Sequence, residues 1–400
     1  MKNTETRKPI KMEDFLRPQM FQQWTRMVHF AWKRDGSNRL VKSSSIGFWI
    51  SAVLNLVFFA FNGWDIIGHL MMGKPTNQNP PVLCITIYFS IRGLMLFLKR
   101  REIINFVYAL DRECPVDIDK QHEIRLERTY SSFWMRYRFL RAYAHLGLPM
   151  FCCLPLAVYL LTNDGLGAPI TLHQQLLGGW MPFDLRRNPR FYLLVWLFDV
   201  SCTACGVSFF LTFDNLFNVM QGHLIMHLNH LCRQLEAIDP AESVTNEVEF
   251  FAGLRTLVQR QQLLNRLCGQ YNDIFKVAFL VSNFMGSGSL CFYLFMIAET
   301  TDIFMIIQYI LPTMVLVAFT FEICLRGTQL EEASARLESS LRHQTWYMGS
   351  RRYRKFFLLW LQYSQRSQKL GAFGLIEINM VHFTDIMQLA FRLFTFLRSQ

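Results

Sequence analysis

Long apolar runs alternate with polar, basic segments along most of this 400-residue chain. Each run is about 18 to 26 residues long, which is the length that an α-helix needs to cross a bilayer. The seven runs are approximately Ile46–Gly63, Pro81–Leu98, Ala142–Leu161, Phe191–Phe213, Ile274–Ala298, Ile303–Leu325 and Ala372–Leu397. The pattern predicts an all-α, polytopic membrane protein with seven transmembrane helices, spans 1 to 7. Only Glu299 to Asp302 separates spans 5 and 6, so these two helices are expected to form an antiparallel pair.

The seventh run differs from the others because it carries a polar stripe. Steps of three or four residues put its polar side chains on one face of a helix. These side chains are His382, Asp385, Gln388, Arg392 and Thr395. Ionisable groups at membrane depth are unfavourable unless they face water, a partner or the bundle interior. We therefore expect the stripe to line an aqueous path shared between several copies of such a helix. The alternative is that Asp385 and Arg392 pair with neighbouring helices.

The basic residues are distributed unequally between the loops. Of the 41 Lys and Arg residues, 33 fall in the arm 1–45 and in the loops after spans 2, 4 and 6. Five fall in the opposite loops and tail, and three lie inside spans. Because basic loops stay in the cytoplasm, the N-terminus is predicted to be cytoplasmic and the C-terminus extracellular, the reverse of a G-protein-coupled receptor. The net charge of +11 therefore does not indicate nucleic-acid binding.

The segments on the predicted cytoplasmic side have helical patterns of their own. Residues 214–273 and 326–371 keep apolar residues at helical spacing. Spans 4, 5 and 6 are therefore expected to continue past the bilayer and to build a cytoplasmic helical layer that anchors subunits to one another. The arm 1–45 carries Phe21 and Trp24 at helical spacing, which predicts an amphipathic helix lying against the membrane or the bundle.

Residues that could catalyse a reaction or bind a metal form no recognisable motif. His223, His227 and His230 have spacings that can hold zinc, but no Glu follows the first histidine, and a buried or solvated helix face is the better interpretation. Cys202 and Cys205 have the spacing of a redox or zinc pair, but they lie inside an apolar span. We therefore expect neither enzymatic activity nor a metal or other cofactor.

Aromatic residues gather in the outer halves of spans 2 to 6. Aromatic rings with a few polar tips suit a pocket for a small apolar ligand, although such rings are also common in membrane cores. The candidate ligand-binding residues are Tyr88, Phe89, Tyr159, Tyr192, Trp196, Phe292 and Tyr309. Arg92 and Asp199 also lie inside spans and are candidates for buried pairs, whose partners the sequence does not identify.

The last part of the chain resembles the C-terminal region of insect odorant receptors. The likeness is carried by Trp346-Tyr347, by the basic run 351–355 that leads into the apolar residues 356–359, by Ser-Gln pairs at 364 and 367, and by the final Ala390-Phe391-Arg392-Leu393-Phe394-Thr395. The inverted topology, the short turn after span 5 and the chain length are similar too.

This resemblance implies an odorant-gated, nonselective cation channel in the plasma membrane of a sensory neuron dendrite. In that family a variable receptor subunit assembles with a shared co-receptor into a tetramer. The final span lines the pore, which would be formed here by Asp385, Gln388, Arg392 and Thr395. The implied partners are a small volatile odorant bound in the outer half of the bundle, the co-receptor and membrane lipid, with no nucleic acid.

The end of the last span departs from the common family pattern, where Tyr and Ser are more usual at positions 391 and 392. An Arg392 that faces a cation path opposes conduction, which fits a chain that supplies a minority of the pore helices.

Two alternatives share parts of this interpretation. A gustatory receptor has the same architecture, but its usual closing pattern, a Thr-Tyr pair followed by Gln-Phe, is not found between Phe391 and Gln400. A transporter could use Asp385 and Arg392 as coupling groups, but the sequence shows no internal repeats or broken helices.

Overall fold

A computed structural model describes residues 8–16, 46–72, 79–162, 176–177, 191–365 and 367–399. Most of the predicted amphipathic arm, including Phe21 and Trp24, lies outside these residues. The helices of the first half are α1 (Met12–Leu16), α3 (Ile46–Met71), α4 (Asn79–Leu98), α5 (Arg100–Glu113), α6 (Ile118–Glu123), α7 (Leu126–Ala142), the π-helical turn η1 (Tyr143–Gly147) and α8 (Leu148–Thr162). The second half contains α9 (Tyr192–Glu236), α10 (Glu242–Thr245), α11 (Glu247–Glu299), α12 (Ile303–Arg342), the 3-10 turn η4 (Trp346–Met348), α13 (Arg351–Ser364), strands β1 (Gly371–Ala372) and β2 (Ile376–Glu377), and α14 (Met380–Ser399).

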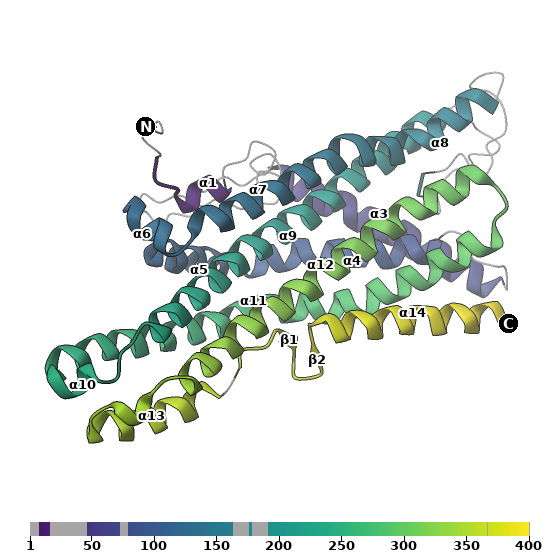
Figure 1. Ribbon diagram of the computed structural model, residues 1–400. Coiled ribbons are helices and arrows are strands. Elements are labelled where there is room, and N and C mark those ends of the chain that lie inside the picture. Colours follow the sequence, from purple (N-terminus) through teal and green to yellow (C-terminus); the bar gives the residue numbers. More distant parts are fainter. Residues whose placement is uncertain are drawn as a thin grey trace.

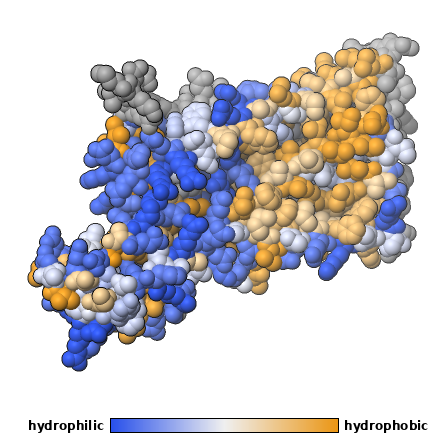
Figure 2. All heavy atoms as spheres, viewed as in Figure 1, coloured by the Kyte–Doolittle hydropathy of each residue, from blue (hydrophilic) through white to orange (hydrophobic). Residues whose placement is uncertain are grey.

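The long helices run roughly side by side and form an elongated bundle (Figure 1). The end that contains α6, α10 and α13 is hydrophilic. Apolar side chains cover the opposite part of the bundle, around α8 and the first half of α12 (Figure 2). In the described chain, six helical stretches are long and apolar enough to cross a membrane. They belong to α3, α4, the continuous α7–η1–α8, α9, α11 and α12. The protein is a multi-pass membrane protein. Because α14 is not among the six, the count of seven stays a prediction.

Helices α9, α11 and α12 are much longer than a bilayer is thick. They contain 45, 53 and 40 residues. At about 1.5 Å per residue they are about 68, 80 and 60 Å long, against about 30 Å for the hydrocarbon core. The prediction that spans 4, 5 and 6 continue without a break beyond their apolar runs is confirmed. The turn between α11 and α12 also forms where it was predicted, and the Asp302 side chain accepts a hydrogen bond of 2.8 Å from the Phe304 N–H.

The seventh helix begins later than the apolar pattern predicted. Residues 371–377 form a short antiparallel hairpin of β1 and β2, in which Gly374 has a φ of 71°. Glycine adopts that left-handed conformation without a steric penalty. The helix α14 begins at Met380, after Asn379, whose side-chain oxygen accepts a hydrogen bond of 3.0 Å from an N–H of the first turn. The predicted start at Ala372 is wrong, because the turn residues outweigh the apolar run.

The segment that leads into α14 is fixed against α12. A Cβ atom on Gly327 would lie only 1.9 Å from the carbonyl oxygen of Ile378, so the two backbones can approach this closely only at a glycine. Next to this contact, the Met380 N–H donates a hydrogen bond of 3.0 Å to the hydroxyl of Thr328. The beginning of α14 is therefore held to α12 by one close backbone approach and one hydrogen bond to a side chain.

The largest hydrophobic core lies in the hydrophilic half of the bundle, where α5, α9, α11 and α13 pack together. The rings of Phe217, Tyr271 and Phe275 are at its centre, with Phe217 centroids 5.6 and 5.4 Å from the other two. The same core continues into the predicted spans, where it includes Met95, Phe213 and Phe279. The hydrophilic half and the apolar half of the bundle therefore share one continuous core.

A buried ion network joins α7, α9 and α12. The guanidinium of Arg136 binds the carboxylates of Asp214 and Glu322 and donates a hydrogen bond of 3.1 Å to the Asn215 side chain. The Asp214 side chain is almost completely buried. Because breaking a buried ion pair leaves an uncompensated charge, these three helices are tied together at this level.

Candidate functional site

A small, mostly apolar cavity lies within the apolar part of the bundle, between α3, α4, α8, α9, α11 and α12. Its volume is about 90 Å³. One water needs about 10–15 Å³ by this kind of measure, so the cavity admits a molecule of several heavy atoms. The walls include Phe58, Val82, Ile85, Tyr88, Phe89, Tyr143, Phe151, Val207, Phe210, Tyr293 and Leu316. Aromatic and aliphatic walls of this kind suit a small apolar ligand.

Few polar groups in the cavity are free to bind a ligand. The hydroxyls of Thr86 and Thr203 each donate a hydrogen bond of 2.8 Å to the carbonyl one helical turn earlier. The amide nitrogen of Asn55 does the same at 2.8 Å. The hydroxyls of Tyr143 and Tyr293, in contrast, form no hydrogen bond with another described residue. These two phenols are therefore the donors that the cavity offers.

A buried cation lies directly behind the cavity wall. Arg92 is only 1% exposed, and it donates hydrogen bonds of 2.5 Å to the Tyr88 hydroxyl and 3.3 Å to the Ser282 hydroxyl. Its guanidinium carbon lies 4.2, 4.8 and 4.9 Å from the ring centroids of Tyr88, Phe210 and Phe213. No carboxylate of the described residues pairs with it. The partners of the buried Arg92 are thus hydroxyls and aromatic faces, and the rings take the place of a counter-ion.

The structure divides the sequence-predicted ligand residues between three places. Tyr88 and Phe89 line the cavity. Tyr159, Tyr192 and Trp196 form a separate cluster between α8 and α9, where the two tyrosine rings stack with centroids 4.1 Å apart. The Trp196 indole donates a hydrogen bond of 2.9 Å to the Cys152 carbonyl, which fixes this cluster away from the cavity. As for Asp199, its carboxylate accepts a hydrogen bond of 3.4 Å from the Leu177 N–H.

The remaining two predicted residues flank the cavity without lining it. Tyr309 packs against Tyr293 with ring centroids 6.2 Å apart, and Phe292 is half-buried on the adjacent face of α11. The cavity instead uses Tyr293, which belongs to the same group of aromatic residues in the outer halves of the spans. It also uses Tyr143 and Phe210, which were not predicted as ligand-binding residues. In the sequence, these lining residues are distinguished only by the aromatic enrichment that they share with the predicted residues. An error of one residue turns a side chain by about 100° around the helix, which is enough to move it out of the cavity.

The polar stripe of α14 forms as predicted on one face of a helix. All four candidate pore residues are exposed in the single chain: Asp385, Gln388, Arg392 and Thr395. Ile386 and Ala390 on the opposite face are buried against the bundle. This surface of α14 is free to face water or another subunit.

The described residues bring no three His, Cys, Asp or Glu side chains together in a way that could hold a metal ion. Among these residues, only pairs of such side chains approach one another: the ring of His227 lies 3.9 Å from the Cys114 sulfur, and that of His230 lies 3.7 Å from the Glu123 carboxylate. Burial, followed by the neighbouring His223 and Arg260, lowers the pKa of His227 to about 3. Burial likewise lowers the pKa of His223 to about 4. Both imidazoles are therefore neutral core residues at neutral pH.

A family model described as "7tm Odorant receptor" matches residues 73–391 of the chain. The chain belongs to the odorant receptor family. The receptor is 68% identical to Odorant receptor 88a of Drosophila melanogaster over 400 residues, which is 100% of both chains. It is also 26% identical over 223 residues to Odorant receptor 67c of Drosophila melanogaster, covering 55% of this chain and 54% of the relative.

Solved structures of the insect olfactory receptor OR5 from Machilis hrabei share the fold. The receptor matches OR5 in complex with eugenol with a TM-score of 0.77, at 14% identity, over 96% of this chain and 99% of that chain. The match to a second structure of OR5 has a TM-score of 0.74 at the same identity and coverage. The receptor is thus of the insect odorant type and is not an enzyme. These findings favour the odorant receptor over the gustatory receptor and transporter alternatives.

Proposed function

We propose that the receptor is an odorant-binding subunit of a ligand-gated, nonselective cation channel. It assembles with a shared co-receptor into a tetramer in the plasma membrane of a sensory neuron dendrite. The observation that carries the proposal is the cavity between α4, α9, α11 and α12, whose walls are aromatic and whose free polar groups are two phenols. The family assignment and the shared fold with an olfactory receptor solved with eugenol support the same conclusion.

The ligand is a small volatile molecule, mainly apolar, with one hydrogen-bond acceptor. Rings such as Phe89 and Phe210 supply the apolar contacts, while the hydroxyl of Tyr143 or Tyr293 donates to the acceptor. In an apolar surrounding one such hydrogen bond also fixes the orientation of the ligand. The cavity is small, so a ligand larger than its present volume has to displace the side chains in its wall.

The channel is formed by α14 together with the equivalent helices of other subunits. The exposed stripe of Asp385, Gln388, Arg392 and Thr395 faces the aqueous path, and Ile386 on the other face holds α14 to its own bundle. The cationic Arg392 opposes cation flow, so a homomer of four such helices conducts poorly. Co-receptor subunits that supply most of the pore relieve this barrier.

Gating follows from a difference in affinity between two packings of the bundle. The cavity touches α9, α11 and α12, and the latter two helices also pack against α14. A ligand that separates the cavity walls therefore shifts the support on which α14 rests. The packing that accommodates the ligand best is then populated, and the pore opens.

Whole-cell recording tests this function. The receptor is expressed with and without an odorant co-receptor, with surface expression confirmed, and a panel of volatile molecules is applied. We expect a ligand-evoked cation current when both subunits are present and little current from the receptor alone. Absence of any evoked current in both settings contradicts the proposal, as does concentrative uptake that persists when the current is blocked.

The same cells also test whether the ligand binds in this cavity. Gly206→Ala places a Cβ atom 3.1 Å from the Phe89 ring at the cavity wall, which narrows the space for a ligand. The matched control is Gly253→Ala, where a Cβ atom meets nothing within 4 Å. Sensitivity to ligand is expected to fall only for Gly206→Ala. Equal responses from the two variants contradict this position for the site.

A further inference from the structure

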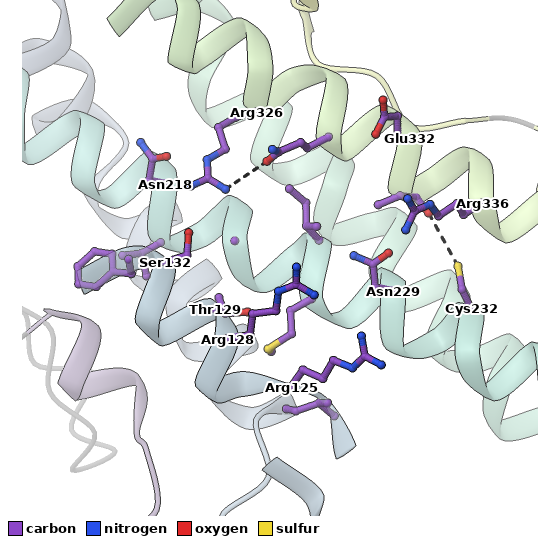
Figure 3. A pocket seen from close by; sticks show the side chains of 18 of the residues that line it. Arg125, Arg128, Thr129, Ser132, Asn218, Asn229, Cys232, Arg326, Glu332 and Arg336 are labelled. Carbon is purple, nitrogen blue, oxygen red and sulfur yellow. Dashed lines mark hydrogen bonds between the residues drawn. The ribbon is translucent and has the colours of Figure 1, made fainter. Parts of the chain in front are cut away.

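A larger hollow in the hydrophilic half of the bundle is surrounded by arginines (Figure 3). This groove has a volume of about 530 Å³ and lies between the beginning of α7, the second half of α9 and the second half of α12. Six arginines line it against two glutamates, Glu236 and Glu332. The arginines are Arg125, Arg128, Arg136, Arg233, Arg326 and Arg336. The groove, which we call the arginine groove, therefore has a large excess of positive charge.

Only one of the six arginines is neutralised by carboxylates. Arg136 lies at the end of the groove nearest the apolar belt and binds Asp214 and Glu322. Arg233 donates a hydrogen bond of 3.0 Å to the carbonyl of Glu123, which satisfies a donor without cancelling the charge.

The other four arginines have no carboxylate partner among the described residues. Arg326 donates a hydrogen bond of 3.2 Å to the amide oxygen of Gln329, a neutral group. Arg125, Arg128 and Arg336 are exposed to the groove and form no ion pair within the described chain. Burial lowers the pKa of Arg326, and the charge of Arg136 adds to this effect although Glu322 opposes it. The groove thus holds its arginines together against their mutual repulsion.

The arrangement of these side chains suits a ligand that spans the groove. Arg125 and Arg128 come from the α7 side, Arg326 and Arg336 from the α12 side, and Asn229 lies on α9 between them (Figure 3). A guanidinium presents a planar fork of donors that matches two oxygens of a phosphate group. Cationic groups on two opposite walls can therefore bind two or more phosphates at once, which a single anion such as chloride cannot satisfy.

We propose that the arginine groove binds a multiply phosphorylated anion, which is either the headgroup of a phosphoinositide lipid or a soluble inositol polyphosphate. Neutral donors and acceptors on the same walls, including Thr129, Ser132 and Asn218, can bind the hydroxyls of an inositol ring. Arg136, at one end of the groove, precedes the first residue of predicted span 3, Ala142, by six positions, so a headgroup at the membrane surface is within reach.

Binding at this place has a structural consequence. The anion bridges the beginning of α7 to the second half of α12, two segments that are otherwise joined at this level by the Arg136 network. It also removes the repulsion between the unpaired arginines. Binding should therefore stabilise the hydrophilic half of the receptor, and this readout does not depend on odorant binding or on channel activity.

The experiment measures the thermal unfolding of the purified full-length receptor in two settings. In detergent, inositol hexakisphosphate is the soluble probe. In phosphatidylcholine nanodiscs, phosphatidylinositol bisphosphate is compared with phosphatidylinositol. A rise of the unfolding temperature with the soluble probe identifies a free polyphosphate as a ligand. A rise only with the bisphosphate lipid identifies the headgroup, and either result supports the proposal.

Two variants remove charge from the arginine groove, and one matched variant removes it elsewhere. Arg128→Gln/Arg336→Gln neutralises two exposed, unpaired arginines on opposite walls, and Arg101→Gln/Arg112→Gln makes the same change of net charge on α5, away from the groove. The groove variant should raise the apparent Kd of the phosphorylated probe by at least about tenfold, and the control should leave this Kd unchanged.

A second groove variant guards against a folding defect in the first. Arg125 has a φ of 60°, a left-handed conformation that glycine adopts more easily, so Arg125→Gly removes the charge without straining the backbone. It should also weaken binding. No stabilisation of the wild-type receptor by either probe overturns the proposal, and so does equal weakening in the groove variants and the control.

Discussion

The guanidinium of Arg92 and the hydroxyl of Tyr88, one turn apart on α4, are joined by a hydrogen bond of 2.5 Å. Tyr88 lines the apolar cavity, whereas Arg92 lies behind it and contacts the faces of Tyr88, Phe210 and Phe213. The wall of the cavity is therefore backed by a buried positive charge that has no carboxylate partner in the described chain. Any movement of this wall also moves the groups that stabilise the charge.

The first prediction concerns this hydrogen bond. Tyr88→Phe keeps the ring but leaves a donor of the buried guanidinium without its acceptor. We expect the free energy of unfolding to fall by about 1–3 kcal/mol, the usual effect of an unsatisfied buried group. Thermal unfolding of the purified receptor measures the change. Tyr159→Phe is the control, because the buried Tyr159 hydroxyl has no hydrogen-bond partner among the described residues and its loss should be nearly neutral. Equal shifts for both variants would contradict the role of Tyr88.

The second prediction concerns recognition of the ligand. Tyr293→Phe removes one of the two free phenol donors of the cavity. Sensitivity to a ligand that carries an acceptor should fall by about tenfold, which corresponds to the loss of one hydrogen bond. Sensitivity to a hydrocarbon of similar shape should not change. Dose–response curves recorded with the co-receptor measure both values. Tyr159→Phe again serves as the control, since Tyr159 lies in the separate cluster and should leave both curves unchanged.

The third prediction concerns the network at the boundary of the apolar belt. Arg136→Met leaves the buried carboxylate of Asp214 without its cation. Removal of one partner of a buried ion pair costs about 3–5 kcal/mol, so the variant should unfold at a much lower temperature or fail to reach the membrane. Arg138→Met, two residues further along the same helix, changes an exposed side chain and should behave like the wild type. Similar yields and unfolding temperatures for the two variants would show that the ion network contributes little to the stability of the folded receptor.

The fourth prediction is a dependence of stability on pH. Burial lowers the pKa of His223 to about 4 and that of His227 to about 3, whereas both ionise with an ordinary pKa of about 6.5 in the unfolded chain. Between these values the unfolded state binds more protons, so stability falls as the pH decreases. From about pH 7 to pH 5 each histidine contributes a loss of about 2 kcal/mol.

The histidine prediction is checked with unfolding temperatures measured at both pH values. In His223→Gln/His227→Gln the loss on acidification should be smaller than in the wild type. His343→Gln replaces an exposed histidine and should keep the full pH dependence. A double variant with an unchanged pH profile would mean that other groups cause the loss.

The fifth prediction concerns conduction. Arg392→Gln removes a positive charge from the exposed stripe of α14 and should increase the single-channel conductance for cations by about a factor of two or more. Arg398→Gln is the comparison, because Arg398 lies six residues later and about 120° around the helix. It should leave the conductance unchanged. An identical conductance for wild type and Arg392→Gln would place that residue outside the ion path.

Much of the fold could be predicted from the sequence because the relevant patterns are long. Apolar residues at helical spacing continue from span 4 through residues 214–236 without a proline or a cluster of glycines, and α9 is accordingly one helix. The four-residue break Glu299–Asp302 could only be a tight turn. The start of α14 was missed because a hairpin with Gly374 at its turn interrupts a run that hydrophobicity alone presents as continuous.

The sites were harder to predict because they depend on which way side chains face. Span 5 is apolar on all sides, so no pattern distinguishes Phe292 from Tyr293, although only the second lines the cavity. Likewise, the charge count predicted that Arg125, Arg233 and Arg326 lie on the same side of the membrane. That they converge on one groove depends on the packing of three distant segments, which a single sequence does not contain.

The close contact between Gly327 and the Ile378 carbonyl fixes the beginning of α14 to α12, so this contact would be the pivot of any tilt of α14. The 20 residues of α14 extend about 30 Å from that pivot. A tilt of about 10° there displaces the far tip by about 5 Å, while the pivot itself hardly moves. A small rearrangement of α12 near Gly327 would therefore produce a larger displacement at the C-terminal end of α14. A bulkier residue at position 327 would push the beginning of α14 away from α12.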